Sequence, residues 1–330
     1  MIASPVLIIG CARSGTTLLY NVLAEVESLW SLGYESKALI ERDHAPAARG
    51  WESGALAAGD LTAEGRDWLL RAFDAAAAPG SYWRRVNQLR HALNRTGAYT
   101  GLKRRGRAGT AAAAAVPGAG LGMFRAGARL RRRLSPSGRP IRLLEKTPEN
   151  CLRLPFMQAL FPDARVIFLV RDGRANVHSL LEGWRQPHLF PGYRTPLPVT
   201  SPGQTRGRWA FTLIPGWREL VDRPLAEICA RQWAVSNATV LDYAATANAL
   251  PVLTVRYEAL VADADSALAA IAGFLGLRPT DIPAHGRGLP EVNVISRPGA
   301  EKWRAEAEAI AGVAPILAPV MARLGYPLAL

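Results

Sequence analysis

Residues 6–17 read VLIIGCARSGTT, and this segment sets the architecture expected for the chain. Four consecutive apolar residues suit a short strand that is covered on both faces of a sheet. Small residues follow, and then a helical pattern over Thr16–Val26 places Leu18, Leu19, Val22 and Leu23 on one face. A strand, a glycine-containing loop and a helix in this order predict an α/β protein.

Three further segments have the composition of buried strands. They are Arg142–Glu145, Arg165–Val170 and Val252–Tyr257. A second helical pattern covers Asp265–Leu275. Strands that alternate with helices predict a central parallel sheet flanked by helices.

The loop after the first strand has the character of an anion-binding site. A strand that leads through small residues into a helix directs free backbone N–H groups and the positive helix end at one point. A nucleoside-triphosphate loop would carry lysine directly after its second glycine, where this chain has Thr16. The cation here is Arg13. A nucleotide kinase and a glycine turn that binds nothing remain as alternatives.

A second candidate anion site is RVIFLVRDGRANVHS, residues 165–179. It places Arg171 at the end of an apolar strand and Ser179 on the helix that follows. Ligands of open α/β sheets bind beyond the carboxyl ends of the strands, and a guanidinium with a hydroxyl can hold a phosphate there. The alternative is a solvent-facing arginine and a serine on a helix surface.

RSGTT (13–17) and VRDGRANVHS (170–179) together resemble the PAPS-dependent sulfotransferases, in particular the tyrosine-protein branch and related bacterial enzymes. The resemblance implies a P-loop-like three-layer sandwich that binds PAPS and releases PAP. It also implies a phosphosulfate loop and a 3′-phosphate site, made respectively by Arg13, Ser14, Gly15, Thr16 and Thr17, and by Arg171 and Ser179. Ala12 departs from the family, which often has proline there.

Two later segments extend the resemblance. VRYEAL (255–260) is similar to a family element whose tyrosine, here Tyr257, lies near the nucleotide. VNV (292–294) followed by Lys302 resembles an element whose lysine meets the 3′-phosphate. This chain has extra residues between those two parts, which leaves Ser296 and Arg297 as further candidates.

The resemblance also assigns the chemistry. Glu35 matches the catalytic base of the tyrosine-protein enzymes, and Arg13 would stabilise charge on the departing phosphate. Lys146, in the segment EKTP (145–148), would contact the sulfonate, with Glu145 as the reserve base. No metal is demanded. His178 is expected to face the core or the wall of the cleft.

We expect residues 1–330 to form one sulfotransferase domain with an insertion at 101–139 and a long surface loop at 185–209. The insertion holds ten of the lysines and arginines and no acidic residue, in a chain with net charge +13. It would guide an acidic acceptor, touch anionic lipid or form a solvated lid. Nucleic acid is not expected as a partner, because no reader motif accompanies the charge.

The remaining features bear on location and acceptor. Three widely spaced cysteines and the lack of a charged leader before the first apolar run favour a reducing, cytoplasmic location. The acceptor would be a hydroxyl-bearing small molecule, sugar, lipid or peptide. A non-catalytic PAP-binding protein is the rival from another functional class.

Overall fold

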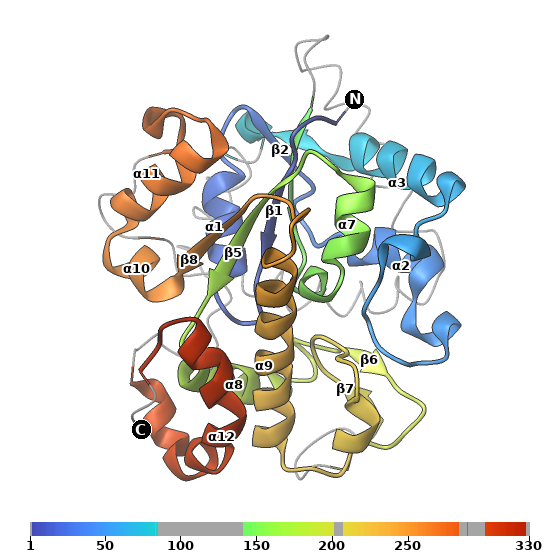
Figure 1. Cartoon of the computed structure of the whole chain (residues 1–330), viewed down its shortest axis with the longest axis vertical. Coiled ribbons are helices and arrows are strands. Elements are labelled where there is room, and N and C mark those ends of the chain that lie inside the picture. The colour runs from blue at the N-terminus through green and yellow to red at the C-terminus, as the bar shows by residue number, and fades with distance from the viewer. Residues whose placement is uncertain are drawn as a thin grey trace.

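A six-stranded sheet runs through the molecule in the order β3-β2-β4-β1-β5-β8 (Figure 1). The computed structural model describes residues 2–82, 84, 141–200, 207–283, 289 and 301–327. The basic segment 101–139, Ser296 and Arg297 lie outside these residues. The strands are β1 Val6–Ile9, β2 Leu29–Ser31, β3 Ala78–Pro79, β4 Arg142–Lys146, β5 Arg165–Val170 and β8 Val252–Arg256.

All neighbouring strands pair in parallel except β2 and β3. Alternate residues of the central strand β1 face opposite sides: Val6 and Ile8 join one buried cluster, and Leu7 and Ile9 join the other. Every β1 residue is fully buried. Two apolar cores on the two faces of one sheet make three layers, so the predicted three-layer α/β sandwich is confirmed.

Helices cover both faces of the sheet. In Figure 1, α1, α10 and α11 lie on one side of the sheet, and α2, α3 and α7 lie on the other. The α-helices are α1 Thr16–Leu23, α2 Lys37–His44, α3 Ala63–Ala76, α7 Leu154–Leu160, α8 Gly173–Trp184, α9 Leu225–Ala244, α10 Tyr257–Ala262, α11 Ala264–Leu275 and α12 Ala307–Arg323. Short 3₁₀ turns include η3 Pro148–Leu152 and η6 Lys302–Glu306.

Predicted boundaries differ from the structure by one to three residues. Helix α1 ends at Leu23, and the N–H groups of Glu25 and Val26 form tighter i→i+3 bonds before the chain turns into β2. Strand β8 ends at Arg256, and Tyr257 begins α10. The predicted Asp265–Leu275 helix is confirmed as α11, where the Asp263 side chain caps the backbone N–H of Ser266.

The segment predicted as a surface loop at 185–209 contains a short antiparallel pair in its described part. Strand β6, Tyr193–Arg194, pairs with β7, Arg208–Trp209. Trp209 is fully buried and packs edge-on against Trp184 and Trp217. Some aromatic residues of this segment therefore belong to the core. The sequence did not indicate this, because the segment has no regular hydrophobic period.

The strand order diverges between β1 and β5. The chain after β1 leads through α1 toward the β2 edge, and the chain after β5 leads toward the β8 edge. In open α/β sheets the ligand crevice lies beyond the carboxyl ends of the strands at this point of divergence.

Candidate functional site

Expected site residues follow the carboxyl ends of five parallel strands. Lys146 is the last residue of β4, Arg171 follows β5, and Tyr257 follows β8. The loop that begins at Gly10 follows β1, and Glu35 comes shortly after β2. Parallel strands bring these ends to one edge of the sheet, so the fold gathers segments that are far apart in sequence.

The loop between β1 and α1 leaves no room for side chains at its two glycines. A Cβ on Gly10 would lie 2.3 Å from the carbonyl oxygen of Leu169. Gly15 has a φ of 102°, and a Cβ there would lie 2.5 Å from the Tyr257 ring. Both positions need glycine, because the backbone is approached closely and Gly15 is left-handed.

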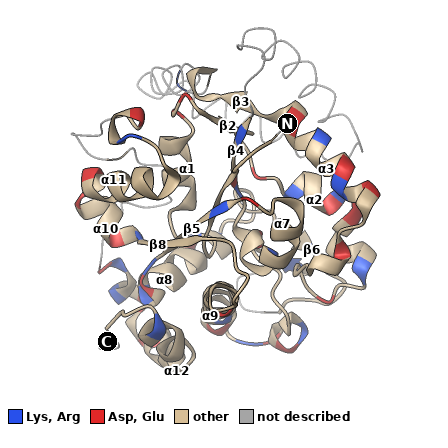
Figure 2. Ribbon diagram, turned by 45° about the horizontal axis from the view of Figure 1, so that its top comes forward, with Lys and Arg blue, Asp and Glu red and all other residues tan. Residues whose placement is uncertain are grey.

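Helix α1 presents its amino end to this loop. Thr16 and Thr17 form its first turn, with Gly15 as the N-cap residue. The helix carries no charged residue (Figure 2), so its first N–H groups are its donors toward an anion. The buried hydroxyl of Ser14 has no hydrogen-bond partner among the described residues. A phosphate oxygen would supply the acceptor that this buried donor needs.

If the chain binds PAP, as the sequence resemblance implies, Gly15→Ala should weaken that binding at least tenfold. The new methyl group would collide with Tyr257, and left-handed backbone costs a non-glycine residue about 1–2 kcal/mol. Calorimetric titration with PAP measures the effect. Gly273→Ala in α11 is the matched control, because a Cβ there meets nothing within 4 Å. Equal PAP affinity in the two variants would show that the loop is not the binding element.

The two predicted anion elements meet each other. The Arg13 Nε lies 3.3 Å from Ser179 Oγ, and Arg171 donates to the Arg13 carbonyl oxygen at 3.2 Å. The Arg171 guanidinium also lies 4.8 Å from the centre of the Tyr257 ring. The buried Nε of Arg171 has no hydrogen-bond partner in the described part of the chain. The structure thus brings Arg13, Arg171, Ser179 and Tyr257 together.

The Arg13 guanidinium is largely buried beside a second cation. Burial, followed by the nearby charge of Arg171, lowers the pKa of Arg13 to about 10, although Glu182 opposes this. The lowered pKa means that the surroundings disfavour the charged guanidinium, chiefly because it is removed from water. A bound anion would relieve this, so the geometry and the electrostatics suit a phosphate ligand.

Lys302 lies beside the helix that carries Ser179. Its ammonium pairs with Glu182 at 2.9 Å, and Glu182 is also 3.9 Å from the His178 imidazole. His178 is buried, as expected, and burial lowers its pKa. Lys302 is therefore connected to the predicted 3′-phosphate site by its ion pair with Glu182, which lies on the same helix as Ser179.

Glu35 and Lys146 form an ion pair next to the loop. The Lys146 ammonium lies 2.6 Å from the Glu35 carboxylate. Lys146 pairs in register with Ile8 of β1, which places it beside the start of the phosphate loop. The Lys146 side chain is 6% exposed, whereas that of Glu35 is 41% exposed, so an acceptor can reach Glu35.

Glu145 has a different environment from Glu35. It is fully buried and accepts hydrogen bonds from Ser36 at 2.6 Å and Asn150 at 2.9 Å. Burial raises the pKa of Glu145, although these bonds and Lys146 act in the opposite direction. No acceptor can reach a carboxylate with zero exposure, so the reserve-base assignment has no geometric support.

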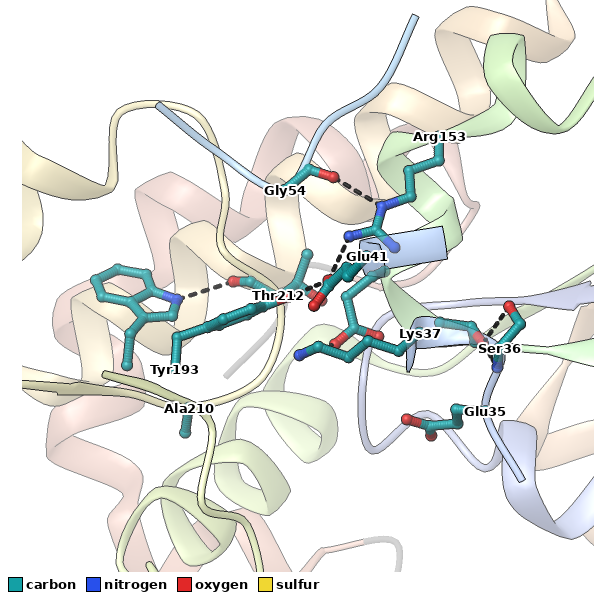
Figure 3. Close-up of polar contacts among 12 residues, drawn as sticks. Glu35, Ser36, Lys37, Glu41, Gly54, Arg153, Tyr193, Ala210 and Thr212 are labelled. Carbon is teal, nitrogen blue, oxygen red and sulfur yellow. Dashed lines mark hydrogen bonds and ion pairs between the residues drawn. The ribbon is translucent and has the colours of Figure 1, made fainter. Parts of the chain in front are cut away.

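A largely buried network of charged side chains surrounds the segment that follows Glu35 (Figure 3). Lys37 pairs with Glu149 at 3.1 Å, and its ammonium lies 3.6 Å from the centre of the Tyr193 ring. The Tyr193 hydroxyl and Arg153 both donate to Glu41 at 2.7 Å. Burial opposes ionisation of Glu149, but Lys37 and then Arg153 lower its pKa. The network joins α2, η3 and β6 around the segment that follows Glu35.

Sequence reasoning missed this network. One signal was available: Arg153 stands inside the apolar run CLRLPFM, residues 151–157, and such an isolated arginine often marks a buried charge. Lys37 and Tyr193 gave no signal, because nothing in their neighbourhoods indicates that they face each other.

Comparisons with known proteins identify the family of the chain. A family model described as "Sulfotransferase family" matches residues 5–194. No curated protein matches the chain. Among solved structures, the chain is similar to the sulfotransferase domain from the curacin biosynthetic pathway, with 15% identity, 99% of both chains covered and a TM-score of 0.46. It is also similar to a sulfotransferase from Alicyclobacillus acidocaldarius, with 13% identity, 99% and 98% covered and a TM-score of 0.45. A third similar structure is retinol dehydratase in complex with androsterone and inactive cofactor PAP. It has 15% identity to this chain, the match covers 97% of this chain and 82% of that one, and the TM-score is 0.36.

Proposed function

This chain belongs to the sulfotransferase family, and on that premise we propose that it transfers a sulfuryl group from PAPS to an acceptor hydroxyl and releases PAP. The observation that carries the proposal is the contact between the loop after β1 and the Arg171–Ser179 element. Two anion-binding elements at one sheet edge suit a single nucleotide with phosphates at two positions.

In this proposal the chain's donors hold the nucleotide at two ends. The N–H groups at the start of α1, with Ser14 and Arg13, bind the 5′-phosphosulfate. Arg171 and Ser179 bind the 3′-phosphate, the guanidinium through charge-assisted hydrogen bonds. Tyr257 closes over the loop glycine, and Lys302 adds positive charge from η6. The buried donors of Ser14 and Arg171 support this assignment, because each gains an acceptor.

The chemistry needs a base, a positioned sulfonate and stabilisation of the leaving phosphate. Glu35 accepts the acceptor hydroxyl proton while that oxygen forms a bond to sulfur and the bond from sulfur to the phosphate oxygen breaks. Lys146 keeps Glu35 oriented and contacts the sulfonate. Arg13 stabilises the negative charge that remains on PAP. The proposal includes no metal, and positioning and charge stabilisation provide most of the catalysis.

Two rival functions are less well supported. A nucleotide kinase would need a lysine that cradles the β- and γ-phosphates, and the residue at that position is Thr16. A non-catalytic PAP-binding protein would have no use for an exposed carboxylate held by a buried lysine. The Glu35–Lys146 pair therefore favours an enzyme.

A cytoplasmic location, inferred from the sequence, is part of the proposal.

Thermal unfolding with PAP and with ATP-Mg separates these functions. A ligand present at a hundred times its Kd stabilises the native state by about 2.7 kcal/mol. We expect PAP to raise the melting temperature and ATP-Mg to leave it nearly unchanged. The reverse pattern would support the kinase and defeat the proposal.

Arg171→Ala should weaken PAP binding roughly ten- to hundredfold, because it removes charge-assisted hydrogen bonds to the nucleotide. Isothermal titration of PAP into each variant measures this change. Arg66→Ala, which removes an exposed arginine of α3, is the control and should bind PAP like the original chain. An Arg171→Ala protein that keeps full PAP affinity would remove this residue from the site.

A further inference from the structure

One aromatic ring lies beside the Arg13 cation, and a second ring packs against the first. The Phe190 ring centre lies 5.0 Å from the Arg13 guanidinium carbon. Phe190 also packs against Phe211, with ring centres 5.2 Å apart and an angle of 46° between the planes. Both phenylalanines are partly exposed. Neither side chain has a role in holding the nucleotide in the function proposed above.

The surrounding backbone is built to hold these rings. A Cβ on Gly183 of α8 would lie 2.4 Å from the Phe211 ring and 3.6 Å from the Phe190 ring. Phe211 has a φ of 61°, which is unusual for a bulky residue. Strained backbone of this kind tends to occur at functional sites, where the surrounding structure enforces it. The fold therefore keeps the Phe211 ring at this place against its local preference.

The same segment reaches the other side of the reaction centre. Three residues after Phe190, Tyr193 contacts the Lys37 ammonium, two residues beyond Glu35. Figure 3 shows the Glu35 and Lys37 side chains directed toward the side on which Tyr193 and Ala210 lie. The segment that carries Phe190 and Phe211 thus extends from Arg13 to the neighbourhood of Glu35, where an acceptor must enter.

The charges differ between the two sides of the site. On the nucleotide side, the groups described above are three cations, Arg13, Arg171 and Lys302, and one carboxylate, Glu182. Around Glu35, the cations Lys37, Lys146 and Arg153 are matched by Glu35, Glu41 and Glu149, and the buried Glu145 adds a fourth carboxyl group. A net positive nucleotide side suits PAPS, whereas an acceptor side without an excess of cations gives an anionic acceptor no uncompensated partner.

We propose that Phe190 and Phe211 form a wall of the acceptor site and that the acceptor carries its hydroxyl on an uncharged aromatic group. This inference rests on the proposed function for the identity of the donor. Aromatic rings attract one another in offset and edge-on arrangements beyond the area that they bury, so such a wall discriminates flat unsaturated groups from saturated ones of similar size. The two phenylalanines determine acceptor specificity and take no part in the chemistry.

Three alcohols of one skeleton test the substrate class: naphthalenemethanol, its fully saturated analogue decahydronaphthalenemethanol, and a naphthalenemethanol that carries a carboxylate. All three react through a primary alcohol, which keeps intrinsic reactivity similar. We expect kcat/KM with PAPS to be about three- to tenfold higher for the aromatic alcohol than for the saturated one. The carboxylated alcohol should be the poorest substrate. Equal kcat/KM values for the aromatic and the saturated alcohol, or the highest value for the carboxylated alcohol, would overturn the inference.

Phe190→Leu and Phe211→Asn test the wall itself. Asparagine tolerates left-handed backbone, so Phe211→Asn removes the ring without adding strain. Both variants should lose the aromatic preference and keep the affinity for PAP. Phe274→Leu, a partly buried phenylalanine of α11, is the control and should keep both. If Phe190→Leu instead weakens PAP binding as much as it lowers kcat/KM, the ring belongs to the nucleotide site and the inference is wrong.

Binding of the alcohols is also measured by equilibrium dialysis with and without PAP. A protein that fails to bind PAP would defeat the proposed function. Its preference among the alcohols, and the loss of that preference in Phe190→Leu, would still decide the inference about the wall. The two failures are therefore distinguishable.

Discussion

We expect Glu35→Gln to lower kcat for sulfuryl transfer by about 10²–10⁴-fold, the range for loss of a general base. Glutamine has nearly the same shape as glutamate, but it cannot accept the acceptor proton. Lys146 loses its charged partner in this variant and keeps a neutral carbonyl within reach. The measurement is a single-turnover assay with PAPS and an accepted alcohol, together with calorimetric binding of PAP.

PAP affinity should change little in Glu35→Gln, because Glu35 lies on the acceptor side of the loop. Glu52→Gln, at an exposed glutamate, is the matched control and should turn over normally. If Glu35→Gln retains most of its turnover, another group takes the proton. A variant that loses turnover and PAP binding together would indicate that Glu35 supports the fold of the site instead.

We expect Arg153→Met to destabilise the protein by about 3–5 kcal/mol, the usual cost of removing one partner of a buried ion pair. Arg153 is fully buried, pairs with Glu41 at 2.7 Å and donates to the Gly54 carbonyl oxygen at 2.8 Å. Its loss leaves the Glu41 carboxylate, which is largely buried, without its cation. Urea unfolding that is followed by circular dichroism measures the change in the free energy of unfolding.

Arg323→Met is the control for this change. Arg323 pairs with Asp242 at the same distance of 2.7 Å, but both side chains are substantially exposed. An exposed pair contributes at most about 1 kcal/mol, so Arg323→Met should have a small effect. A loss in Arg153→Met no greater than in Arg323→Met would mean that the buried network contributes little to stability.

The network around Arg153 also links stability to the acceptor side. It fastens α2, which follows Glu35, to η3 and to the strand that carries Tyr193. Glu35 and the aromatic segment therefore depend on the same buried contacts. The loop between β1 and α1 and the Arg171–Ser179 element lie outside this network. A folded Arg153 variant should therefore lose a larger fraction of its rate of sulfuryl transfer than of its affinity for PAP.

Much of the nucleotide side could be predicted from local sequence. Residues 6–23 and 165–184 each contain a whole strand, turn and helix, so short-range preferences determine where Arg13, Arg171 and Ser179 lie within these segments. The errors at the end of α1 and at Tyr257 are errors of boundary. The α1 error arose because the chain tightens into i→i+3 bonds before β2, and the Tyr257 error arose because α10 begins one residue earlier than the apolar pattern indicates.

The acceptor side could be predicted only in part. Glu35 was identified by resemblance, but its ion pair with Lys146 joins residues 111 positions apart. That pair depends on β2 lying beside β4 and β4 beside β1, which no local pattern specifies. The same applies to Phe190 over Arg13 and to Tyr193 over Lys37.

By itself, the sequence determined the α/β class and the strand–turn–helix segments that carry Arg13, Arg171 and Ser179, because the preferences that form these segments act over a few residues. Only the tertiary structure decided which carboxylate is exposed, which is buried, and which aromatic ring faces the Arg13 cation. Burial and long-range side-chain contacts follow from the order of the strands in the sheet, so the sequence alone does not show that Glu35 is exposed and Glu145 buried.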